Sequence, residues 1–233
     1  MHKTVLSITL ATSLVTLTGC GLNSPSIVPR HLPSKRPPLS ANLARTVQHL
    51  SSTNITIMAP MHVAVQSIGP ISSGNGHYDV HIVTPQSVSV SFGGQNDGSN
   101  ANAQTLLQQL LIISPSLGSP LPLGFGITAH AYSRQALITW TEKNWTVQVS
   151  GPPRTPISLL KPAAEAIASQ LHRVQLPHTT MGVLTWAHKH HGQNALDLSW
   201  QSGSTVYWVN EPYGHAIAVP IDMASSMHIL NAP

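Results

Sequence analysis

Three short runs near the C-terminus decide the fold. Residues 182–188 read Gly-Val-Leu-Thr-Trp-Ala-His, residues 196–200 read Leu-Asp-Leu-Ser-Trp, and residues 205–209 read Thr-Val-Tyr-Trp-Val. Short polar segments separate these runs, which are rich in Val, Leu and Trp. We expect three strands that form an antiparallel meander.

A similar pattern lies roughly sixty residues earlier in the chain. Residues 126–130 read Gly-Ile-Thr-Ala-His, residues 136–140 read Ala-Leu-Ile-Thr-Trp, and residues 145–149 read Trp-Thr-Val-Gln-Val. Similar segments at a fixed period indicate an internal repeat. The alternative is a chance similarity between two β-rich segments.

A helix is expected after each meander. In the first helix Pro162 is tolerable only in the first turn, and in the second Pro220 suits the first helical position. The apolar positions at helical spacing are Leu160, Ala163, Ala164, Ile167, Ala168 and Leu171, then Met223, Ala224, Met227 and Leu230. One βββα unit cannot bury both its sheet face and its helix stripe efficiently, so we expect two units to close one core.

The part of the chain before the repeat adds strands and one helix. Strands are expected at 54–58, 61–66, 78–83 and 87–92, followed by a polar loop at 93–102, a helix at 103–113 and a connector at 114–124. In the last of these strands Val88, Val90 and Phe92 alternate with serines, which is typical of a half-buried strand. The predicted fold class is α+β, an antiparallel sheet with helices packed on one side and a tandem βββα repeat.

The N-terminus carries a secretory signal. His2 and Lys3 precede an apolar stretch at 5–17 and the sequence Leu17-Thr18-Gly19-Cys20. This stretch is too short to cross a hydrocarbon core of about 30 Å as a helix. Leu-Thr-Gly-Cys resembles the lipobox of bacterial lipoproteins, which implies cleavage before Cys20, diacylglycerol on its sulfur and an acyl chain such as palmitate on its amino group. The alternative is an ordinary secretory peptide followed by a stray cysteine.

The predicted domain organisation follows from these features. Residues 1–19 are the signal peptide, 20–48 the lipidated cysteine and a Pro-rich tether, 49–124 an N-terminal α+β part, and 125–233 the repeat part, divided into 125–180 and 181–233. The predicted location is the extracytoplasmic face of the cell membrane, with the lipid anchor as the membrane partner.

Composition excludes several functional classes. The single cysteine excludes intramolecular disulfides and zinc-thiolate sites. The basic residues are scattered, so no nucleic-acid partner is expected. The chain has 14 His but only 7 Asp and Glu, and with 8% charged residues it has few ion pairs to lose in acid. We therefore hypothesise an acid-tolerant protein, with compositional drift as the alternative.

Two groups of residues are candidate binding sites. His188, His190 and His191 form the densest histidine cluster and could hold Zn²⁺ or Cu²⁺, although a solvated turn is the alternative. All five tryptophans fall in the repeats, and Trp145, Trp186, Trp208 and Tyr207 are candidate ligand-binding residues. Large aromatics on strands more often belong to a core. Trp208 faces opposite to Tyr207 and Val209, so one sheet face there must expose an aromatic or lie under a helix.

The sequence contains no catalytic motif that we recognise. The Gly-x-Ser-x-Gly and His-Glu-x-x-His patterns are absent, and Glu142, Glu165, Asp197 and Glu211 do not form an obvious carboxylate pair. We expect a non-catalytic binding or envelope-assembly module without a cofactor, whose partner is a peptide, a glycan or a protein. The alternatives are a metal-binding lipoprotein and a hydrolase of cell-wall or other polymer.

Overall fold

Alternating apolar and polar residues build one large sheet. The computed structural model describes residues 43, 46–47, 50, 55–113, 117–189, 194–214 and 216–230. The predicted signal peptide, Cys20 and most of the tether lie outside the described residues. None of the described helices is long and apolar enough to span a membrane.

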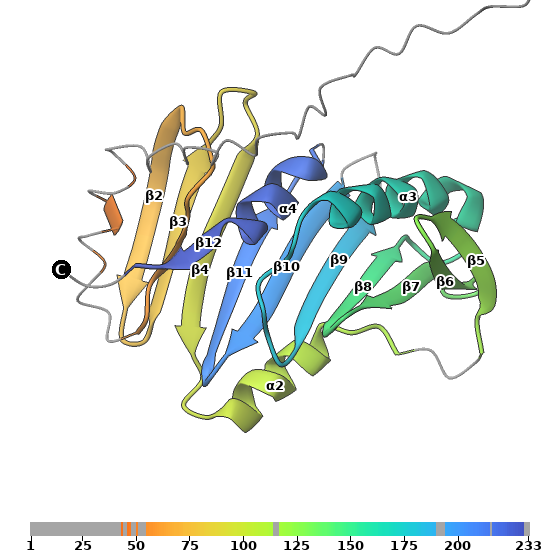
Figure 1. Cartoon of the computed structure of the whole chain (residues 1–233), viewed down its shortest axis with the longest axis horizontal. Helices are drawn as coiled ribbons and strands as arrows, with labels where there is room; N and C mark the ends of the chain where they lie inside the picture. Colours follow the sequence, from red (N-terminus) through yellow and green to blue (C-terminus); the bar gives the residue numbers. More distant parts are fainter. Residues whose placement is uncertain are drawn as a thin grey trace, which may run out of the picture. The chain divides into compact units, whose positions relative to one another are not determined.

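The sheet has ten strands in the order β2-β3-β4-β11-β10-β9-β8-β7-β6-β5 (Figure 1). Their bounds are β2 Ser67–Gly74, β3 His77–Val83, β4 Ser89–Asn96, β5 Ser119–Gly124, β6 Ile127–Tyr132, β7 Leu137–Glu142, β8 Trp145–Ser150, β9 Gly182–His188, β10 Asn194–Ser202 and β11 Thr205–Glu211. Neighbouring strands are antiparallel except β8 and β9, which are parallel. Because β4 pairs with β11, strands from both predicted parts, 49–124 and 125–233, belong to the same sheet.

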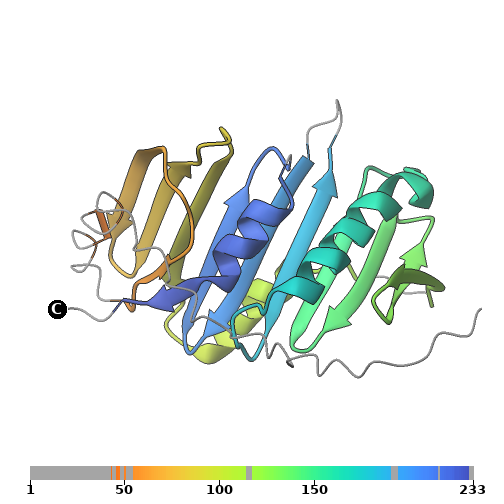
Figure 2. The same cartoon turned by 45° about the horizontal axis from the view of Figure 1, so that its top comes forward.

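Helices cover both faces of this sheet, unequally. Helix α3 (Ile157–Arg173) packs on β5 to β8, and α4 (Ala218–Ser225) packs on β10 and β11 of the same face. Helix α2 (Asn100–Gln109) packs on β10 and β11 from the opposite face (Figure 2). The α+β class is confirmed, but the expectation that all helices lie on one side is wrong. Below, the face under α3 and α4 is called the covered face and the other the open face.

The covered face contains the main core. Trp140, Trp145, Trp186 and Trp200 are all at most 5% exposed, and they pack with the apolar residues of α3 and α4. Beside this core, β1 (Met58–Pro60) pairs with β12 (Met227–Ile229), separately from the large sheet. On the open face, α2 buries Ala103 and Leu107 against Val183 and Val206 in a second, small cluster.

Both predicted helices of the repeat part form, with shifted ends. Helix α3 begins at Ile157, so Pro162 lies beyond the first turn, contrary to expectation. An interior proline costs about 3 kcal/mol, which the burial of the apolar stripe of α3 offsets. Helix α4 begins at Ala218 and keeps Pro220 in its first turn. It ends at Ser225, so Met227 is in strand β12 instead of the helix, because its backbone pairs with β1.

The largest differences from prediction lie before residue 125. Residues 61–66 form no strand, and the following residues, 67–74, form β2 instead. Helix α2 begins at residue 100 because the Ser99 hydroxyl caps it by accepting from the Asn102 N–H (3.1 Å). The predicted connector 114–124 contains strand β5, whose Pro120 and Pro122 are compatible with the edge of a sheet.

Candidate functional site

The open face carries two rows of side chains that run across the strands. Cross-strand pairing aligns Ser72, Asp79, Gly93, Trp208, Ser199 and Val183 in the first row. The second row consists of His81, Ser91, Asn210, Asp197, Thr185 and Gln148. Residues directly opposite on neighbouring strands project from the same face. The face that lacks α3 and α4 is therefore predominantly polar.

A groove of about 600 Å³ lies on these rows. It extends from Ser72 on β2 to Thr185 on β9, and Leu110, just after α2, borders it. Among the described residues, neither Lys nor Arg lines this groove, although the chain as a whole has a formal charge of +4. Its charged lining residues are Asp79 and Asp197. The volume lies within the usual range of small-molecule sites.

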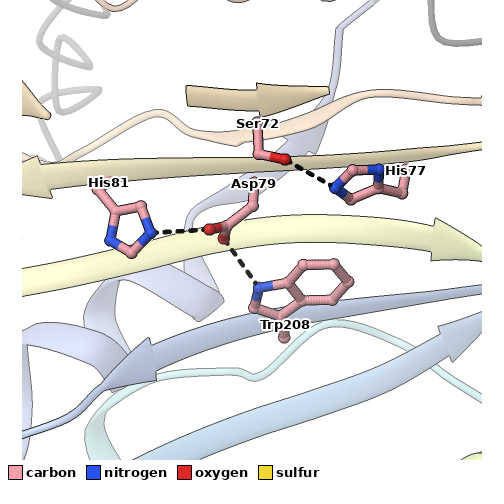
Figure 3. Close-up of polar contacts among 5 residues, drawn as sticks. All are labelled: Ser72, His77, Asp79, His81 and Trp208. Atoms are coloured by element: carbon pink, nitrogen blue, oxygen red, sulfur yellow. Dashed lines mark hydrogen bonds and ion pairs between the residues drawn. The ribbon is translucent and has the colours of Figure 1, made fainter. Parts of the chain in front are cut away.

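Trp208 is held in the middle of the first row. Its Nε1 donates to Asp79 Oδ1 (3.2 Å), and Asp79 Oδ2 lies 2.8 Å from His81 Nε2 (Figure 3). A Cβ atom added to Gly93 would lie 2.3 Å from Cζ2 of the indole, so the ring packs directly against the backbone of β4. Trp208 is half-buried and lines the groove, so part of its side chain is accessible from it.

A second polar contact borders the same groove. Ser72 Oγ lies 3.1 Å from His77 Nε2 (Figure 3). The pair differs from a Ser-His-Asp triad, because Asp79 contacts His81 and Trp208 and is not bonded to His77. Ser72 and His77 thus provide hydroxyl and imidazole groups at one end of the groove.

No family model matches the chain, and neither the curated proteins nor the solved structures contain a match.

Of the four predicted aromatic candidates, Trp208 alone reaches this groove. Trp145, Trp186 and Tyr207 are 3%, 5% and 2% exposed and pack in the core of the covered face. Trp145 Nε1 donates to the Pro177 carbonyl (3.2 Å), and its ring packs on Trp200. Trp145 also borders a cavity of about 120 Å³, which is below the usual size of a ligand site. These three residues therefore belong to the core, which was the alternative to ligand binding.

Sequence reasoning missed most of the groove. It placed Gly93 in a loop, whereas Gly93 lies within β4 and gives room to the Trp208 ring. A glycine inside a strand often marks the close approach of another group, and that signal was present. His77, Asp79 and His81 recur at every second position, which also indicated one polar strand face.

The acidic residues are dispersed. Asp79 and Asp197 lie three strands apart, about 14 Å at the usual strand spacing. Burial raises the pKa of the Asp197 carboxyl, while a hydrogen bond donated by Asn210 and the charge of Lys189 oppose this rise. Glu165 pairs with Lys161 on α3, whereas Glu142 and Glu211 end β7 and β11. The two carboxylates of the groove, Asp79 and Asp197, therefore do not form a pair. Each of them has its own hydrogen-bond partners.

The predicted histidine cluster is only partly described. His188 Nδ1 lies 2.9 Å from Asn194 Oδ1, and its ring stacks on Trp186. His190 and His191 lie outside the described residues. Within the described ranges, no three His, Cys, Asp or Glu side chains are grouped so that they could hold a metal ion. The Zn²⁺ or Cu²⁺ site stays a prediction.

Proposed function

We propose that this chain is a lipid-anchored, extracytoplasmic binding module that holds its ligand on the open face of the sheet. The anchor is the lipid on Cys20 that the lipobox resemblance implies. The module acts without catalysis: it retains a component of the cell envelope or its surroundings near the membrane. For the alternatives, the described residues contain no group of three His, Cys, Asp or Glu side chains that could hold a metal ion, and the Ser72–His77 pair lacks the bonded carboxylate of a Ser-His-Asp triad.

The observation that carries the proposal is the exposed surface of Trp208 in a preformed groove. Large aromatic side chains are normally placed in a core, as the other four tryptophans are here. Trp208 instead lies on the polar face, where Gly93 supports its ring and Asp79 accepts from its N–H. Ligand sites combine aromatic side chains with placed polar groups, and the lining of this groove contains both.

We further propose that the sheet contains the tandem βββα repeat. Three strands and a helix (β6, β7, β8, α3) are followed by three strands and a helix (β9, β10, β11, α4). Trp140 and Trp200, which occupy corresponding positions of the two copies, are both buried on the covered face. The parallel contact between β8 and β9 is where one unit would meet the next.

The anchor is tested by expressing the full chain and its Cys20→Ala variant in a bacterial host. We expect the wild-type protein in the membrane fraction, with a mass that corresponds to a diacylated or triacylated chain beginning at Cys20. The variant should lose the lipid and leave the membrane fraction. An unmodified Cys20 in the mature wild-type protein would contradict the anchor, and this result is independent of the groove.

A further inference from the structure

We propose that the groove on the open face binds a neutral polysaccharide, with a pyranose ring stacked on Trp208. This inference rests on the proposed binding function and names the class of its ligand. It follows from three properties of the groove: the aromatic surface, the polar groups around it, and its charge and length.

The Trp208 ring is organised in advance for stacking. Gly93 supports one side of the indole, and Asp79 fixes its edge through the Nε1 hydrogen bond of 3.2 Å. Asp79 is itself held by His81, so the indole has a defined orientation before a ligand arrives (Figure 3). The π face of an aromatic ring is electronegative. The axial C–H groups of a pyranose form a flat, weakly electropositive apolar surface that complements it.

The surrounding side chains match sugar hydroxyls. Each hydroxyl can both donate and accept hydrogen bonds, so it needs partners of both kinds. Ser199 is directly opposite Trp208 on β10, and Asn210 is in the next row on β11. With Gln95 and Thr185, these residues give the groove amide and hydroxyl groups on both sides of the indole. The amides of Gln95 and Asn210 each already donate to an aspartate, Asp97 and Asp197, which leaves one N–H and the carbonyl oxygen of each amide for a ligand. The groove thus combines one apolar surface with several neutral polar groups.

The charge of the groove disfavours the charged polymers common in an envelope, although His77 is also among its lining residues. A phosphate, sulfate or uronate chain needs cationic side chains, and neither Lys nor Arg is among the residues that line the groove. A cationic peptide would need available carboxylates. Both oxygens of Asp79 are already engaged by His81 and Trp208, and Asn210 donates to Asp197, whose burial favours its neutral form. These observations favour an uncharged ligand.

The length of the groove indicates a chain instead of a single sugar. Its lining runs from β2 to β9, which are five strand spacings apart in the sheet. This corresponds to about 24 Å across the strands. Several linked pyranose rings can lie along that distance, with one of them on Trp208.

The test uses isothermal titration calorimetry of the full chain, in detergent, with defined oligosaccharides. Cellohexaose, maltohexaose and chitohexaose are the neutral probes; hexagalacturonate and hexalysine are the charged ones. We expect at least one neutral probe to bind, with an affinity that changes less than twofold between 50 and 500 mM salt because no charge pairing is involved. Trp208→Ala should weaken binding at least tenfold, and Trp208→Phe less.

Phe125→Ala provides the matched control. Phe125 is an exposed aromatic outside the groove, 53% accessible, in the turn between β5 and β6, where its ring stacks on His172. This variant should bind like the wild type. Far-ultraviolet circular dichroism of each variant excludes misfolding as the cause of lost binding.

The outcomes separate the two proposals. Binding of hexalysine or hexagalacturonate alone, abolished by Trp208→Ala, overturns the neutral-sugar inference and leaves the binding function standing. Neutral-sugar binding that is unchanged by Trp208→Ala overturns the assignment of the site. If no probe binds, the neutral-sugar inference is overturned. A second measurement then compares how much wild-type and Trp208→Ala protein attaches to purified envelope polysaccharide and to peptidoglycan. Equal attachment of the two proteins overturns the binding function as well.

Discussion

The two faces of the sheet are built from the same strands, but they surround their tryptophans differently. Trp145 on the covered face and Trp208 on the open face are each seated over a glycine, Gly182 and Gly93. The indole N–H of Trp145 bonds to a backbone carbonyl, and the residue is 3% exposed. The N–H of Trp208 bonds to a carboxylate, and its ring borders a groove. A buried indole of the first kind stabilises the fold, whereas we propose that the second, held beside a groove, contacts a ligand.

The largest expected effect comes from the centre of the covered face. Trp200 is 1% exposed and contacts Trp145 and Tyr207. Trp200→Ala should lower the free energy of unfolding by about 3–5 kcal/mol, because it leaves a large cavity. Urea denaturation measures this loss, and Trp200→Phe should lose less. A loss below about 1 kcal/mol would contradict a core built on this face.

The next largest effect is expected from substituting the glycines under the two indoles, Gly93 and Gly182. Gly93→Ala and Gly182→Ala should each cost about 1–3 kcal/mol, because the added methyl group meets an indole ring at 2.3–2.4 Å. At Gly93 the methyl group also meets the Tyr78 carbonyl oxygen at 2.3 Å, so Gly93→Ala should cost the more of the two. Of the two variants, only Gly93→Ala should move Trp208 and reduce neutral-sugar binding. Gly182→Ala displaces Trp145 and should leave binding unchanged once the protein is folded. Equal effects on binding would remove the distinction between the faces.

Trp208→Ala should lower the free energy of unfolding less than Trp200→Ala or Gly182→Ala, which both change the core of the covered face. The ring is half-buried and does not fill the main core, so the expected loss is about 1 kcal/mol in urea denaturation. A loss as large as that of Trp200→Ala would mean that Trp208 serves mainly to hold the fold together.

The smallest effect concerns pH. Burial raises the pKa of Asp197, so the native state binds this proton more readily than the unfolded chain. Stability from this group therefore rises as the pH falls from neutral toward the ordinary value of 3.8, and is lost as the pH rises. Asp197→Asn should be at least as stable as the wild type at pH 7, and the difference should vanish below pH 3.8. A variant less stable at pH 7 would contradict this account.

The same reasoning bears on acid tolerance, which stays a prediction. Burial also raises the pKa of Asp222, against a hydrogen bond from Gln170 and the charge of Arg173. The ion pairs among the described residues include His81 with Asp79 and Lys161 with Glu165. Acid therefore removes few native interactions in the described part of the chain. Unfolding above about pH 3 would argue against tolerance.

Local sequence patterns predicted the positions of the strands better than they predicted which strands pair with each other. The expected runs at 136–140, 145–149 and 182–188 coincide with β7, β8 and β9 within one or two residues, because alternation depends on adjacent residues. The pairing of β4 with β11 joins segments more than a hundred residues apart, and no local pattern encodes it. The face that α2 covers likewise depends on the completed sheet.

Only part of the candidate site could be predicted from the sequence, for the same reason. The opposite orientations of Trp208 and Tyr207 followed from strand geometry, and the structure confirms them. That Asp79 accepts from Trp208 depends on β3, β4 and β11 lying side by side. The choice among Trp145, Trp186 and Trp208 required knowing where α3 and α4 pack.

The most direct test of the difference between the faces is fluorine NMR of the full chain labelled with 5-fluorotryptophan. Trp208→Phe assigns the Trp208 resonance among the five. We predict that a soluble gadolinium chelate broadens the Trp208 resonance strongly, leaves the other four nearly unchanged, and that a bound neutral oligosaccharide protects Trp208. A protected Trp208 in the free protein, or broadening of several core indoles to the same extent, would contradict the account.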